Sequence, residues 1–253
     1  MSTAPTPATV WTCGGESIDA STRWPVPIVE SITAAFTAPG AHVVLVDIDT
    51  APTVPEEELI AARDAVRALD RTVDTLTVDT GAPVSGSAAR PFWADLVADQ
   101  PTARASTSPT STETPGTDVG ARADLVLVAV PACAGGTVPL DRLALLAANR
   151  LRQGGIFAVY THSDWNQGEL VDPTGAIVVA CQHADLLYLQ HIVTLHAPVR
   201  QGCPHAVPSA SETAEYDRAR QRAAVRGLPA PHLRAHGDVL VFAQPADTAG
   251  EGR

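Results

Sequence analysis

The sequence is poor in aromatic residues and has no lysine. Only 4% of its 253 residues are aromatic while 45% are hydrophobic, so its core must be built mainly from alanine, valine and leucine. Acidic residues outnumber basic ones by 28 to 17, which gives a formal net charge of −11. A nucleic-acid duplex is densely negative and is normally met by a basic protein surface. The charge balance therefore argues against strong nucleic-acid binding by this chain alone.

The sequence also shows no cysteine pair, and we expect no leader segment or membrane span in it. The four cysteines lie far apart and form no CxxC pair, which favours isolated thiols over a disulfide framework or a zinc site. The first ten residues show no charged region followed by an apolar run, and no apolar run approaches the length of a bilayer span. We therefore expect a cytoplasmic protein with no membrane partner.

One stretch, residues 24–49, organises the rest of the chain. It begins with a turn at Trp24-Pro25, continues as an amphipathic helix, and ends in a strand from His42 to Asp47. The continuous aliphatic run in that strand is typical of a strand covered on both faces of a parallel sheet. Acidic residues at its carboxyl end lie where open α/β sheets bind ligands.

The remaining chain alternates between predicted helices and strands. Helices are expected over residues 55–69, 140–151, 173–189 and 211–226, and strands over residues 73–78, 124–130, 156–160, 191–195 and 239–242. This alternation predicts an α/β, Rossmann-like domain with a mostly parallel sheet, whose last two strands pair as a C-terminal antiparallel hairpin. We expect one domain over residues 11–245, flanked by a disordered tail at 1–10 and a second tail at 246–253. A Ser/Thr/Pro-rich insertion at 99–120 is expected to be disordered as well.

Several segments, taken in order, match the pattern of a known family. They are TRWPVPIVESITAAFTAPGAHVVLVD, RADLVLVAVPA, ANRLRQGGIFAVYT and the C-terminal pair GELVDPTGAIVVACQHADL and ARQRAAVRGLPAPHLRAHGDVLVF. The chain resembles the amino DNA methyltransferases, which methylate N4 of cytosine or N6 of adenine, and its C-terminal third is similar to actinobacterial members. The resemblance covers nearly the whole chain outside residues 1–10, 80–120 and the last ten. It implies a class I S-adenosylmethionine (SAM) methyltransferase fold with a seven-stranded sheet, and SAM as the cofactor.

The resemblance also implies roles for particular residues. Asp79 and either Asp47 or Asp49 would be the cofactor acids, one at the amino-acid end of SAM and one on its ribose hydroxyls. Trp24 and Pro25 would lean on the cofactor edge. Acids that follow a strand are also common turn residues, and a Trp-Pro turn also packs against a sheet, so both interpretations stay open for each residue.

Two motifs depart from the family pattern. The family has a glycine-rich loop after the first strand, which lets the backbone approach the cofactor, but residues 47–55 contain two prolines and no glycine. Val130 and Pro131 occupy the catalytic motif and would line the acceptor pocket. However, the motif lacks the polar residue that accepts the target amino hydrogen and the aromatic residue that stacks on an extruded base. No segment has the size and basicity of a target-recognition domain.

These observations lead to three hypotheses. The first is a SAM-dependent methyltransferase-like protein related to the DNA amino-methylases, which would methylate an amino nitrogen of a nucleic acid or a small molecule. The second is a catalytically inactive homologue that acts as a binding or regulatory subunit for a protein partner, or that assembles with a second copy of itself. The third is a small-molecule enzyme built around His162 and Asp164. The C-terminal histidines show no metal-ligand spacing, so we expect ordinary surface or capping histidines and no metal site.

Overall fold

The computed structural model describes residues 9–12, 15–49, 55–79, 122–132, 139–166, 169–232 and 234–246. Most of the two expected tails, the loop at residues 50–54 and the expected insertion at 99–120 lie outside these residues.

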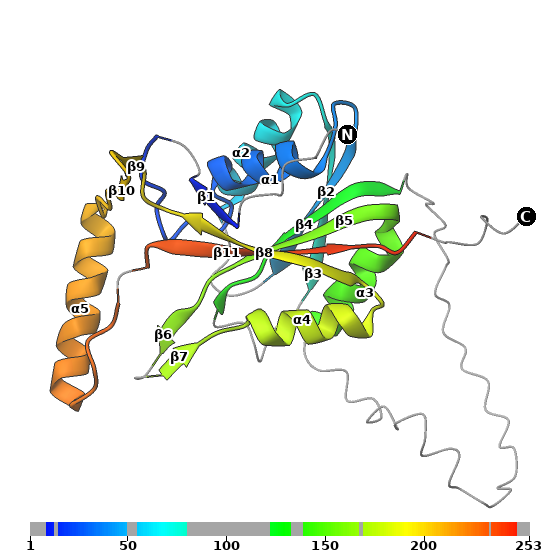
Figure 1. Cartoon of the computed structure of the whole chain (residues 1–253). Coiled ribbons are helices and arrows are strands. Elements are labelled where there is room, and N and C mark those ends of the chain that lie inside the picture. The colour runs from blue at the N-terminus through cyan, green and yellow to red at the C-terminus, as the bar shows by residue number, and fades with distance from the viewer. Residues whose placement is uncertain are drawn as a thin grey trace, which may run out of the picture. The chain divides into compact units, whose positions relative to one another are not determined.

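The described residues form a seven-stranded sheet with the strand order β1-β8-β11-β5-β4-β2-β3 (Figure 1). Its strands are β1 (Val10–Thr12), β2 (His42–Asp49), β3 (Thr72–Asp79), β4 (Ala123–Ala129), β5 (Leu151–Thr161), β8 (Leu187–Leu195) and β11 (His236–Ala243). Strand β11 runs antiparallel to both β5 and β8, and the other neighbouring pairs are parallel. The predicted α/β, mostly parallel sheet with a C-terminal antiparallel hairpin is therefore confirmed, and the hairpin consists of β8 and β11.

Two helices cover each face of this sheet. Helices α1 (Val26–Phe36) and α2 (Glu56–Ala68) lie on one face, and α3 (Leu140–Arg150) and α4 (Thr174–His183) lie on the other (Figure 1). Strand β2 is buried on both sides, because Val43 packs in the cluster under α1 and α2 while Val44 packs in the cluster under α3 and α4. This double cover explains the continuous aliphatic run in its sequence.

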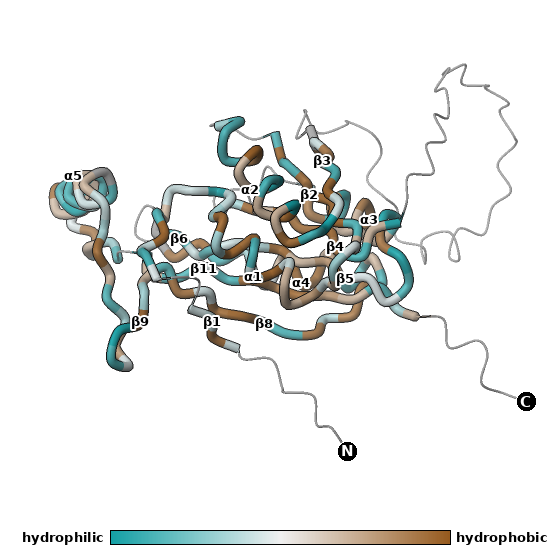
Figure 2. Tube along the Cα trace, turned by 90° about the horizontal axis from the view of Figure 1, so that it is seen from above, coloured by the Kyte–Doolittle hydropathy of each residue, from teal (hydrophilic) through white to brown (hydrophobic). Residues whose placement is uncertain are grey.

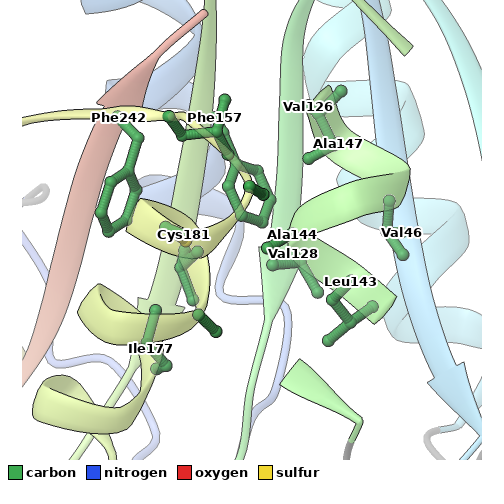
Figure 3. Close-up of a cluster of buried hydrophobic side chains, with 14 of the residues drawn as sticks. Val46, Val126, Val128, Leu143, Ala144, Ala147, Phe157, Ile177, Cys181 and Phe242 are labelled. Atoms are coloured by element: carbon green, nitrogen blue, oxygen red, sulfur yellow. The ribbon is translucent and has the colours of Figure 1, made fainter. Parts of the chain in front are cut away.

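The core cluster under α3 and α4 consists of hydrophobic side chains (Figure 3). The rings of Phe157 on β5 and Phe242 on β11 lie with their centroids 6.2 Å apart, and Cys181 of α4 packs in the same cluster. Burial raises the pKa of the Cys181 thiol to about 12, so this cysteine is an inert core residue. The small cavity in this layer is lined by hydrophobic side chains and that thiol. It offers a ligand no strong polar contact and therefore lacks the polar groups that orient ligands in binding sites.

Helix α5 (Ala210–Arg226) is specified by local signals more than by packing. Ser209 and Glu212 form a reciprocal capping box at its start, and Gly227 ends it in the left-handed conformation with a φ of 65°. The helix is hydrophilic along most of its length (Figure 2), and none of its described side chains is fully buried.

Several element boundaries differ from the sequence-based prediction, among them the start of β5, which lies at Leu151 although the strand is expected from residue 156. The helix expected over 173–189 ends at His183, because Asp185 takes a φ of 59° and the chain enters β8 at Leu187. The apolar residues run on across this boundary, so periodicity could not locate it. Val10–Thr12, expected to lie in the tail and a loop, forms β1, a short edge strand parallel to β8. A strand of this length carries too few residues to show an alternating pattern.

Two short hairpins lie outside the main sheet. Strand β6 (Asp164–Asn166) pairs with β7 (Glu169–Val171), and β9 (Val199–Arg200) pairs with β10 (Cys203–Pro204). Among the described helices, none combines the length and the apolar character needed to cross a lipid bilayer.

Candidate functional site

The carboxyl ends of four parallel strands meet along one edge of the sheet. From β2 the chain first adds β3 on one side and then crosses back to add β4 on the other side, with β5 beyond it. Open α/β sheets bind ligands outside the carboxyl ends of their strands at such a switch point. This edge is therefore the candidate site.

The sequence-predicted acids and the predicted acceptor edge come together here. Asp47 and Asp49 lie at the end of β2, and Asp49 is paired in register with Asp79, the last residue of β3. Val130 and Pro131 follow directly after β4, the neighbour of β2 on its other side. Residues from three separate parts of the sequence thus converge at the switch point.

Trp24 and Pro25 form a buried turn over the end of β2. Trp24 is only 2% exposed, and Pro25 is buried beside it. Glu58, in the first turn of α2, accepts hydrogen bonds from the backbone N–H groups of Arg23 at 2.9 Å and Trp24 at 3.3 Å. Arg23 in turn donates from Nη1 to the carbonyl of Ile48 at 3.1 Å. The turn is therefore tied both to α2 and to the carboxyl end of β2.

Asp47 is a carboxyl group that shares its side of β2 with apolar core residues. It alternates with Val43 and Leu45, which belong to the core under α1 and α2. Burial raises the pKa of Asp47; the charge of Arg23, and to a smaller extent the indole N–H of Trp24, act in the opposite direction. Although the indole is this close, neither Asp47 Oδ1 nor Trp24 Nε1 has a partner in hydrogen-bond geometry among the described residues. Among the described residues, a buried acceptor and a buried donor at the end of β2 therefore have no partner in hydrogen-bond geometry.

Val130 and Pro131 place no polar side chain at the end of β4. The N–H of Val130 donates to the carbonyl of Tyr160 at 2.8 Å, and the hydroxyl of Thr161 donates to the carbonyl of Val130 at 2.7 Å. The Val130 side chain is buried in the core under α3 and α4. Both main-chain polar groups of Val130 are therefore already bonded to β5.

A second group of polar side chains occupies the same edge at β5 and β8. Tyr160 Oη and His196 Nε2 lie 3.0 Å apart and are buried. The pKa of His162 is lowered to about 3, mainly by burial and to a smaller extent by the charges of Arg234 and His196. Burial, then Arg234 and His236, lower the pKa of His196 to about 4, so both imidazoles are neutral at pH 7. We call Tyr160, His162, His196 and Arg234 the β5–β8 cluster.

Sequence reasoning identified only part of this cluster. It singled out His162 but expected His196 to be a surface or capping residue, which is wrong, since its side chain is 4% exposed. A Cβ atom on Gly237 would come within 2.5 Å of the Tyr160 ring, so a glycine is needed for Tyr160 to lie against β11. A glycine inside a strand pattern often marks a close approach, and this was the one available signal.

The end of β2 and the β5–β8 cluster lie on the same face of the sheet. Ala129 pairs with Tyr160 across β4 and β5, and extending the printed pairing of Val46 with Val128 by one residue sets Asp47 beside Ala129. Neighbouring strands are about 4.8 Å apart, so the Cα atoms of Asp47 and Tyr160 are separated by about 10 Å. The small side chain of Ala129 lies between them.

Nothing in the described part of the chain resembles a metal centre, since no three His, Cys, Asp or Glu side chains are grouped closely enough to hold an ion. Cys181 is buried and Cys203 is exposed, and both are free thiols. Cys13 and Cys133 lie outside the described residues. The chemistry of this edge therefore comes from carboxyl, imidazole, phenol, indole and guanidinium groups.

No protein-family model and no curated protein matches this chain. Three solved structures illustrate what its fold is similar to. The 1,6-didemethyltoxoflavin-N1-methyltransferase of Burkholderia thailandensis, solved with S-adenosylhomocysteine, is 14% identical, with 87% of this chain and 78% of that chain covered at a TM-score of 0.40. The precorrin-6y C5,15-methyltransferase of Geobacter metallireducens GS-15 is 8% identical, with 90% of this chain and 93% of that chain covered at a TM-score of 0.40. A methyltransferase of Pyrococcus furiosus is 13% identical, with 87% of this chain and 83% of that chain covered at a TM-score of 0.37.

Because these identities and TM-scores are low, we take the fold from the strand order alone. The sheet is mostly parallel, and its last strand, β11, is inserted antiparallel between β5 and β8. This is a Rossmann-like α/β fold, extended by the edge strand β1.

Proposed function

We propose that this protein is a SAM-dependent methyltransferase homologue that binds SAM at the carboxyl ends of β2 and β3. The unpaired Asp47 Oδ1 and Trp24 Nε1 carry the proposal. The methionine part of SAM ends in an ammonium group, which needs acceptors, and a carboxylate, which needs donors. Asp47 would accept from the ammonium group, and Trp24 together with Arg23 would donate to the carboxylate.

The adenosine part would extend toward β3. Asp49 and Asp79 end neighbouring strands in register, and an acid at the end of a strand in this type of sheet is suited to accept hydrogen bonds from ribose hydroxyls. Bound SAM would supply an electrophilic methyl group. The residues of this chain would bind and orient it, with Val130 and Pro131 on the acceptor side.

The relation to the DNA amino-methylases is a finer part of the proposal. It is supported by the order of the sequence motifs and by the convergence of their residues at one edge. Ala129, Val130 and Pro131 offer no side chain that could accept an amino hydrogen. This favours a second candidate function, a catalytically inactive homologue that uses the SAM site to regulate or bind a partner.

Calorimetric titration with SAM and with S-adenosylhomocysteine tests the binding site. We expect Asp47→Asn and Trp24→Phe each to weaken binding about tenfold, because each removes one charge-assisted or buried hydrogen bond. Asp64→Asn is the matched control, since Asp64 is exposed on α2 and pairs with Arg67 at 3.1 Å. No binding heat at millimolar ligand would remove the proposal. Binding without methyl transfer to any DNA or small-molecule acceptor would favour the inactive homologue.

A further inference from the structure

We propose that the β5–β8 cluster is a binding site for a small molecule that carries an oxyanion, either a carboxylate or a phosphate, and that Arg234 anchors it. If the proposed function holds, this anion would be part of the methyl acceptor, and that assignment rests on the proposed function. The binding of the anion itself does not require SAM. The proposal stands on the arrangement of four side chains brought together from three parts of the chain.

Arg234 is a partly buried charge that forms no ion pair with the described residues. Its Nε atom is buried without a hydrogen-bond partner, and no carboxylate of the described residues forms a salt bridge with it. Burial lowers the pKa of Arg234, and the largest opposing effect comes from the phenol of Tyr160. An unpaired buried charge is strongly destabilising, so proteins pair nearly all of them. An anionic ligand would supply the missing partner.

Two of the three carboxylates that act on Arg234 accept hydrogen bonds from other donors. Asp164, Glu212 and Asp19 act on Arg234 through their charge. Both carboxylate oxygens of Glu212 accept backbone N–H groups, at 2.8 and 2.6 Å, and Asp19 accepts from the backbone and the hydroxyl of Ser21 at 2.8 and 2.6 Å. These two acids fix the surrounding segments, and neither forms a salt bridge with Arg234, whose Nε has no hydrogen-bond partner among the described residues.

His196 also has a polar atom without a partner among the described residues, whichever tautomer it adopts. If Tyr160 donates to Nε2, then Nδ1 carries a hydrogen with no acceptor; if Nε2 donates to Tyr160, then Nδ1 is an unpaired acceptor. The backbone of His196 is held on both sides, since its N–H donates to Ala235 at 2.9 Å and its carbonyl accepts from Ile18 at 2.8 Å. In the first tautomer, a fixed imidazole N–H is available to an oxyanion.

His162 gives the cluster its solvent-accessible side. It follows β5 directly and is partly exposed, whereas Tyr160 and His196 are buried. With both imidazoles neutral, the cluster contributes one positive charge from Arg234 and several neutral hydrogen-bonding groups. This combination suits a single carboxylate or phosphate group.

Calorimetric titration of the full chain with inorganic phosphate and with acetate, in the absence of SAM, tests the inference. We expect the wild-type protein to bind at least one of them, and Arg234→Gln to lower that affinity about tenfold or more. Arg220→Gln, which changes an exposed arginine of α5, is the matched control and should leave the affinity unchanged. Binding of acetate alone would identify a carboxylate ligand, and binding of phosphate alone a phosphate ligand.

His162→Gln provides a second variant in case Arg234→Gln does not fold, as judged by circular dichroism, and it should also weaken binding. The inference is overturned if the folded wild-type protein binds neither anion, or if the folded variants bind as tightly as the wild type. SAM titration separates this outcome from the proposed function. Anion binding without SAM binding would remove the proposed function and leave this inference standing.

Discussion

The two ends of the candidate site differ in their chemistry. The ends of β2 and β3 bring together the acidic residues Asp47, Asp49 and Asp79, whereas the β5–β8 cluster combines a guanidinium group with a phenol and two neutral imidazoles. One end suits a ligand with an ammonium group and hydroxyls, and the other suits an oxyanion. Because both lie on one face of the sheet, a single edge can hold two ligands of opposite character with their near ends meeting at Ala129.

The largest expected difference between the two ends is their response to acid. His162 and His196 have pKa values of about 3 and 4 in the folded protein, below their ordinary value of 6.5. The unfolded chain therefore binds protons first as the pH falls, and stability is lost progressively below about pH 6.5. We expect a loss on the order of a few kcal/mol by pH 4, measured by urea unfolding across this range.

His196→Gln should remove part of that loss, because glutamine does not titrate. The charged groups that act on His196 are Arg234, His236 and Glu212, so the variant also isolates its contribution from theirs. A wild-type stability that stays constant from pH 6.5 to pH 4 would show that the two imidazoles are not kept neutral by the fold.

Gly237→Ala should damage the β5–β8 cluster through packing. The new Cβ would lie 2.5 Å from the ring of Tyr160, which is buried and bonded to His196, so the ring cannot move freely aside. We expect a loss of about 1–3 kcal/mol in the free energy of unfolding. Gly175→Ala is the control, because a Cβ there meets nothing within 4 Å. Equal denaturation midpoints for the two variants would contradict this packing.

A pair of charge variants should separate the two ligands. Asp49→Asn should weaken SAM binding about tenfold and leave phosphate or acetate binding unchanged, whereas Arg234→Gln should do the reverse. Calorimetry on both variants with both kinds of ligand gives four affinities. If either variant weakens both ligands equally, the two ends do not act as separate sites.

The smallest expected effect is the change in the free energy of unfolding when Asp47 is replaced by asparagine. Burial raises the pKa of this carboxyl group, so its charge destabilises the folded protein at pH values above its ordinary pKa of 3.8. Asp47→Asn should therefore stabilise the protein at pH 7, by less than about 1 kcal/mol because the group is partly exposed. A variant that is more stable but binds SAM more weakly would mark Asp47 as a residue kept for binding. A loss of stability would indicate a structural role instead.

The same contrast explains what the sequence alone could predict. The aliphatic run of β2 and the alternation of helices and strands predicted the α/β sheet, and acids at strand ends are visible in the sequence as soon as the strands are placed. Residues 50–54, the glycine-free loop expected to affect the cofactor, lie outside the described residues.

The β5–β8 cluster could not be predicted in this way. Tyr160, His196 and Arg234 come from parts of the chain that meet only because β11 is inserted between β5 and β8. Each residue by itself reads as an ordinary strand or loop residue. Physical proximity across non-sequential strands is a property of the sheet order, which local periodicity does not encode.

A crystal structure of the protein with S-adenosylhomocysteine is the most direct test of the central claim. We predict that the adenosine part lies over the ends of β2 and β3, with the amino-acid end reaching Asp47 and Trp24, and that the β5–β8 cluster is left clear. A ligand found over Tyr160 and Arg234 instead, or no ligand at saturating concentration, would contradict it.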